Sequence, residues 1–67
     1  MTTKQRTIKA LNFLLKDECL NKWIGYRSDK TTINLVVYMV NLKLVSINEH
    51  FQMKVNQHNA KLFLNNN

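Results

Sequence analysis

The chain is poor in glycine, cysteine and acidic residues, and each scarcity excludes a class of protein. It has one glycine, so it cannot form a glycine-rich loop that cradles phosphates. It has one cysteine, so it forms no internal disulfide, and Cys19 is expected to be a small buried side chain in a reducing cytoplasm. Its longest apolar run, residues 35–40, is far shorter than the roughly 20 residues that span a bilayer.

The few acidic residues leave the chain strongly basic. Four Asp and Glu stand against ten Lys and Arg, which gives a formal net charge of +6. This charge attracts anionic partners over long range. Nucleic acid is the first candidate, and acidic protein surfaces and anionic membranes are the alternatives. Ten asparagines and eight lysines are compatible with a phage or another mobile element as the source.

Residue types that carry catalysis or bind metals are scattered along the chain. Cys19, His50 and His58 lack the close-set ligand pairs of a zinc site. Asp17 and Glu18 are adjacent, and the positive end of a helix dipole explains them better than an acid–base pair does. We therefore expect a protein that is not an enzyme and that has no metal site and no cofactor.

Sixty-seven residues make one domain at most, spanning residues 1–67. The pattern first predicts a helix over residues 4–16, preceded by a capping box of Thr2 and Gln5. Such a helix must pack on the rest of the domain through its apolar stripe. The stripe consists of Ile8, Leu11, Leu14 and Leu15.

Two further helices are expected on either side of the only glycine. The first is short and covers residues 17–24, with Gly25 ending it in a left-handed conformation. The second covers residues 29–43, and Ser28 and Asp29 are good N-caps for it. A strand over residues 33–40 is the alternative, since periodicity alone does not assign a short apolar run.

The period changes in the last third of the chain. Residues 44–47 and 51–55 alternate like the strands of a hairpin around Asn48, Glu49 and His50. Residues 56–59 are predicted to form a polar turn, and residues 60–64 either a third strand or a tail that folds back. Residues 64–67 are expected to be frayed. The fold class is therefore α+β, with three helices followed by a β-hairpin or a small antiparallel sheet.

This order of elements resembles a winged helix-turn-helix domain. The residues that carry the resemblance are Leu20, Trp23, Ile24 and Gly25, residues 28–33, then Val36, Val37 and Val40, and the step Leu42-Lys43-Leu44-Val45. Lys43 stands where many winged-helix regulators have a glycine in a left-handed turn. The resemblance implies a regulator or accessory factor that binds double-stranded DNA, with the third helix in the major groove and the hairpin as a wing.

The polar residues at the start of the third helix are the candidate DNA contacts. Cations there would neutralise phosphates, hydroxyls would donate to phosphate oxygens, and an asparagine would read adenine. Lys54 is the candidate in the wing, and Lys4, Arg6 and Lys9 are secondary candidates. The residues at the helix start are Arg27, Lys30, Thr31, Thr32 and Asn34.

The third helix is apolar on two sides, which supports a different function. One side, expected to face the core, holds Ile33, Val36, Val37, Val40 and Leu44. The other side holds Leu35, Tyr38, Met39 and Leu42. Either residues 62–64 cover this second stripe, or it binds a partner. In the second case the chain is a small phage-type effector that modulates a host polymerase or nuclease, or it forms a homodimer.

Three aromatic residues are considered for stacking on unpaired bases. Trp23 and Phe51 fit the pattern of the core and are expected to be buried. Tyr26 lies in a polar turn, and it is the aromatic residue that we expect to be available for a base.

Overall fold

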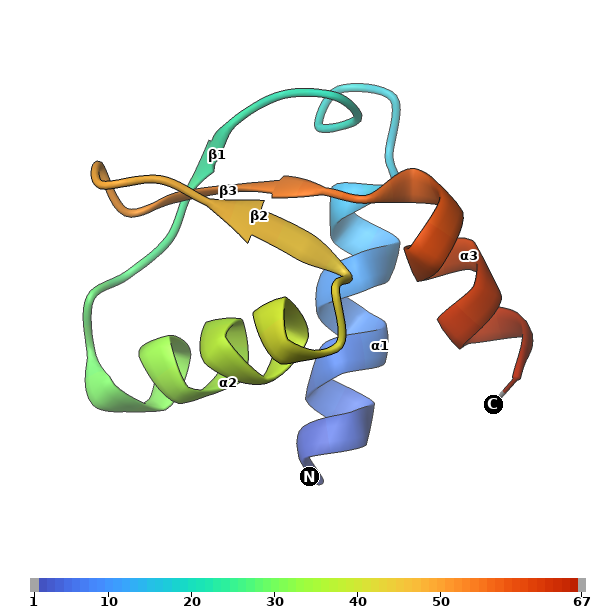
Figure 1. Cartoon of the computed structure of the whole chain (residues 1–67), viewed down its shortest axis with the longest axis horizontal. Helices are drawn as coiled ribbons and strands as arrows, with labels where there is room; N and C mark the ends of the chain where they lie inside the picture. The colour runs from blue at the N-terminus through green and yellow to red at the C-terminus, as the bar shows by residue number, and fades with distance from the viewer. Residues whose placement is uncertain (1, 67) are drawn as a thin grey trace.

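The protein is a small α+β domain built from three helices and a three-stranded antiparallel sheet, as the computed structural model of residues 2–66 shows. β3 lies between β1 and β2, and α1 and α2 lie together on one side of the sheet (Figure 1). The predicted class, α+β, is confirmed. The elements in chain order are α1 (Thr3–Leu14), β1 (Ile24–Gly25), α2 (Lys30–Asn41), β2 (Val45–Ile47), β3 (Gln52–Val55) and α3 (Gln57–Asn65).

α1 begins at the predicted capping box. The Thr2 hydroxyl accepts a hydrogen bond from the Gln5 N–H at 3.1 Å, and the Gln5 side chain accepts one from the Thr2 N–H at 3.0 Å. Two donors at the helix start are thereby satisfied. The helix turns Leu11 and Leu14 into the core, where both are fully buried. It ends at Leu14, two residues before the predicted end.

The predicted second helix does not form. Residues 15–22 make a series of turns with Cys19 buried inside, and β1 follows directly. Ile24 pairs with Met53 and Gly25 with Gln52. Gly25 is therefore a strand residue, and its φ is not positive. The prediction was wrong because an eight-residue helix is marginal by itself. Local hydrogen bonds satisfy part of the backbone of these turns, as from the Cys19 and Leu20 N–H groups to the Lys16 carbonyl, and in this part of the chain only Ile24 and Gly25 pair with β3.

α2 confirms the helix predicted for the middle of the chain and excludes the strand alternative. Asp29 is its N-cap, and its carboxylate accepts hydrogen bonds from the Thr32 N–H at 3.2 Å and the Thr32 hydroxyl at 2.9 Å. The helix ends at Asn41, and Lys43 follows with a φ of 61°. Lys43 thus adopts the left-handed conformation for which many winged-helix regulators have a glycine.

The rotation of α2 about its axis differs from the prediction. Met39 is fully buried and Val36 nearly so, whereas Val37 is 47% exposed. α2 is apolar on two sides, so its own sequence does not fix which side is buried. Contacts with α1 and β2 decide, and they bury a face between the two sides, with Val36 from the predicted core side and Met39 from the other. Met39 is therefore a core residue and not an exposed partner contact.

The hairpin forms as predicted, but the C-terminal segment does not. In the hairpin, Val45 pairs with Val55 and Ile47 with Met53. Residues 57–65 form α3 instead of a polar turn and a third strand. Asn56 caps this helix through a hydrogen bond from the Asn59 N–H at 3.1 Å. Residues 64 and 65 are helical rather than frayed, and residue 67 lies outside the described residues.

A single apolar cluster holds these elements together. Two helices and the inner face of the sheet supply most of it, and α3 adds Ala60. α3 is also fixed to the turn after α2, because the Asn59 side chain donates to the Lys43 carbonyl at 2.9 Å. Within residues 2–66, none of the helices has the length and apolar character required to cross a bilayer. The cluster consists of Leu11, Leu14, Val36, Met39, Leu44, Val45, Val55 and Ala60.

The orientation of α2 can be tested by two truncations of similar size. Met39→Ala is expected to lower the free energy of unfolding by about 2–5 kcal/mol, because it leaves a cavity at a fully buried site. Leu42→Ala is the control, since Leu42 is 44% exposed, and it should cost less than about 1 kcal/mol. Urea unfolding followed by circular dichroism measures both. A larger effect of Leu42→Ala than of Met39→Ala would contradict the burial of these two residues and the orientation of α2.

Candidate nucleic-acid interface

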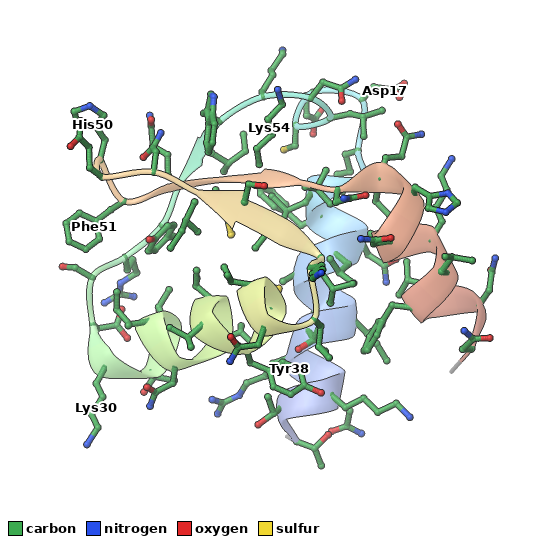
Figure 2. All side chains as sticks on the ribbon, viewed as in Figure 1. Asp17, Lys30, Tyr38, His50, Phe51 and Lys54 are labelled. Carbon is green, nitrogen blue, oxygen red and sulfur yellow. The ribbon has the colours of Figure 1, made fainter. Side chains whose placement is uncertain are left out.

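The start of α2 is the most exposed cationic part of the predicted interface. Lys30 points away from the domain at this end of the helix (Figure 2). Arg27 lies just before the helix, with its Nε 3.4 Å from a carboxylate oxygen of Asp29. Both side chains of this ion pair are exposed, so the pair contributes little to stability. A phosphate can therefore replace Asp29 as the partner of the guanidinium at small cost.

Asp29 is held in its charged form by the helix that it caps. Hydrogen bonds from the Thr32 hydroxyl and N–H, together with the nearby Arg27 charge, lower the pKa of Asp29 below its usual 3.8. The hydroxyl and the N–H of Thr32 therefore already donate to this carboxylate. Thr32, a predicted phosphate contact, holds the cap in place in this structure.

A groove of about 270 Å³ lies between α1 and α2 and gathers several predicted contacts. Thr31 and Asn34 line it from the first turns of α2, and Leu35 lines it beside them. Thr3 and Arg6 line it from the start of α1. Arg6 was only a secondary candidate, because nothing in the sequence relates it to Thr31. The packing of α1 against α2 brings them together. The groove combines a guanidinium with hydroxyl and amide groups, which suits phosphate oxygens and base edges.

The tip of the hairpin lies at the same end of the molecule as the start of α2 (Figure 1). Asn48 shapes the tip, because its side chain accepts a hydrogen bond from the His50 N–H at 2.9 Å. Phe51 follows with a φ of 55°, and its ring meets the Tyr26 ring edge-on at 5.9 Å. Phe51 is 49% exposed, so the prediction that it is a core residue was wrong. Phe51 has a positive φ at the end of the turn, and its side chain is directed away from the core.

Lys54 does not share a surface with the other predicted DNA contacts. It lies on the side of the sheet that faces away from the helices, whereas Lys30 lies on the far side of α2 (Figure 2). The Lys54 ammonium is 5.9 Å from the centroid of the Trp23 ring. Trp23 is 44% exposed, contrary to prediction, because Ile24 takes the inward position of β1. Tyr26, the predicted stacking residue, packs partly against the core.

The apolar stripe proposed as a partner interface is broken up by the fold. Met39 is buried, Leu35 and Tyr38 pack partly against the core, and Leu42 is exposed. Other apolar side chains are exposed instead, among them Val37 of α2 and Ile47 of β2. These two belong to elements that pack against each other, and β2 is an edge strand.

Comparison with known proteins adds no functional assignment to this geometry. No family model matches the chain, and neither the curated proteins nor the solved structures contain a match. The arrangement of the described residues is therefore the basis for a functional conclusion.

The Asp29 cap makes a pH-dependent contribution to stability that can be isolated. Because its pKa is lowered in the folded protein, the contribution is complete above pH 3.8 and is lost as the pH falls through the folded-state pKa. Asp29→Asn keeps an oxygen acceptor for Thr32 but does not titrate.

We expect the melting temperature of the unmodified protein to fall relative to that of Asp29→Asn between pH 7 and pH 2.5. Thermal denaturation at several pH values measures the difference. A constant difference over this range would show that the carboxylate has the same pKa in the folded and unfolded chains.

Proposed function

We propose that the protein binds double-stranded DNA without catalysis, as a small transcriptional regulator or accessory factor, acting in the host cytoplasm if it is phage-encoded. The observation that carries this proposal is the groove between α1 and α2, where Arg6, Thr31 and Asn34 come together. Lys30 extends this surface at the exposed start of α2 (Figure 2). A net charge of +6 favours approach to DNA.

In this proposal the first turns of α2 enter the major groove. Lys30 and Arg27 contact phosphates at the groove edge, and the release of counterions drives binding. Asn34, one turn into the helix, reads adenine through two hydrogen bonds. Arg6 contacts the neighbouring backbone from α1, so that two helices fix the orientation of the protein on the duplex.

The hairpin supplies a second contact in the manner of a wing. A likeness to winged-helix domains supports this role, because α2 leads directly into β2 and β3, and β3 lies between β1 and β2. The tip with Asn48 and His50 lies at the same end as the start of α2 (Figure 1). Turns and β1 take the place of the helix that precedes the recognition helix in such domains. The proposed contact therefore depends on α1 as the supporting helix.

Single alanine substitutions distinguish this interface from general attraction by charge. Arg6→Ala and Lys30→Ala should each weaken binding to a labelled random duplex. Each should also reduce the slope of log K against log salt concentration by about 0.9 for every phosphate that the variant no longer neutralises. Lys61→Ala is the control, because it removes the same charge from α3, on the other side of the molecule (Figure 1). Fluorescence anisotropy at several salt concentrations provides the slopes. Absence of binding at low salt, or an equal effect of Lys61→Ala, would contradict the proposal.

A protein partner is the second candidate function, because two apolar side chains on neighbouring elements are exposed. Val37 of α2 and Ile47 of β2 are 47% and 43% exposed. A phage-type effector would place such side chains against a host protein or against a second copy of itself.

Charged substitutions at these two positions test the alternative. Val37→Asp and Ile47→Asp should abolish recovery of a partner from host lysate, or self-association in sedimentation, because each places an unpaired charge in the contact. Leu62→Asp is the matched control on α3, where Leu62 is equally exposed. Circular dichroism establishes that each variant folds. Unchanged association of both folded variants would rule out this surface.

A further inference from the structure

The outer face of the sheet is partly open to solvent, with Trp23, Gly25 and Ser46 exposed and Gln52 and Lys54 half-buried. Val45, Val55 and Ile24 point into the core, so the residues that alternate with them point outward. Within residues 2–66 no helix covers this face (Figure 1). None of the outward residues is acidic, and Asp17 lies beyond the end of the face, in the turns before β1 (Figure 2). The outward residues are Trp23, Gly25, Ser46, Gln52 and Lys54, which we call the open sheet face.

Gly25 lies on this face, although the backbone conformation at this position does not require glycine. Its φ is not positive, and a Cβ placed on it would meet no atom within 4 Å. The three described residues that do have positive φ are Asn21, Lys43 and Phe51. A glycine inside a strand weakens the strand, and it often marks a place where a ligand approaches the backbone closely. The missing side chain leaves bare backbone beside Trp23 and Gln52.

We infer that the open sheet face binds single-stranded nucleic acid, with an unpaired base lying over Gly25 next to the Trp23 ring. An aromatic ring on a basic surface is the usual platform for unpaired bases. Trp23 is exposed, and the Lys54 ammonium lies over one part of its ring, 5.9 Å from the centroid. In this inference the base takes the part of the ring toward Gly25, and the ammonium neutralises the phosphate attached to it. Gln52, paired with Gly25, donates to or accepts from the edge of the base.

This surface is separate from the proposed duplex interface. Lys54 and Lys30 lie on opposite sides of the molecule, with the sheet and α2 between them (Figure 2). Stacking on Trp23 requires a base that is not paired, so the two surfaces take different forms of nucleic acid. Failure of one proposal therefore leaves the other intact.

The only tryptophan of the chain reports directly on binding. Titration with oligothymidylate or oligouridylate of twelve nucleotides should quench Trp23 fluorescence, and the two oligonucleotides separate DNA from RNA as the ligand. A duplex of mixed sequence should leave the fluorescence unchanged, because its bases are already stacked. Absence of quenching by both single strands at low salt, or equal quenching by the duplex, would overturn the inference.

Two substitutions on the face test the role of its shape. Gly25→Val fills the bare backbone and should weaken single-strand binding by about 10-fold, because it lifts the base away from the sheet. Its melting temperature should be equal or higher, since valine favours a strand and a Cβ at this position meets no atom within 4 Å. Gly25→Ala is the milder second variant. Unchanged affinity in both variants would overturn the inference.

Charge is tested against matched controls. Lys54→Gln should weaken single-strand binding, whereas Lys61→Gln, which removes the same charge from α3, should not. Lys30→Ala should weaken duplex binding and leave the quenching by oligothymidylate unchanged. If Lys54→Gln and Lys61→Gln weaken single-strand binding equally, the protein attracts single strands only through its net charge, and the inference is overturned.

Discussion

The rest of the structure depends on one apolar core, which packs two helices against one face of the sheet. The inner face of the sheet carries Val45 and Val55, which pack against Leu11 of α1 and Met39 of α2. Both helices are therefore committed to one side. The other side of the sheet carries no helix (Figure 1). The two proposed surfaces are among the parts of the molecule that this core leaves exposed.

Features that depend on residues close in sequence could be predicted. The Thr2 capping box and the Asp29 cap each involve hydrogen bonds across three residues, so the residue types alone indicate them. The hairpin after α2 is local in the same sense, because its two strands are joined by a short turn. The start of α2, with Arg27 and Lys30 exposed beside it, was therefore located correctly.

Features that depend on distant residues could not be predicted. β1 has two residues, and it exists because β3, far along the chain, offers them hydrogen bonds. Exposure of Trp23 follows from that pairing, because Ile24 takes the inward position. Packing against α1 and β2 sets the rotation of α2 about its axis. The packing of α1 against α2 also places Arg6 in the groove. α3 had one local signal, Asn56 as an N-cap, which the polar composition of residues 56–59 obscured.

Two local conflicts with folding lie where β1 meets the end of the hairpin. Phe51 has a φ of 55°, a conformation that costs an aromatic residue free energy, and it directly precedes β3. Gly25 pairs with the next residue, Gln52, and weakens its strand by about 0.5–1 kcal/mol relative to alanine. The chain thus has a strained aromatic residue where glycine would be relaxed, and a glycine where a branched residue would be better. A small domain has little stability to lose, so such conflicts are expected where a ligand requires them. Residues that are unfavourable for their local structure therefore lie at the corner beside Gly25, whereas the start of α2 is well capped.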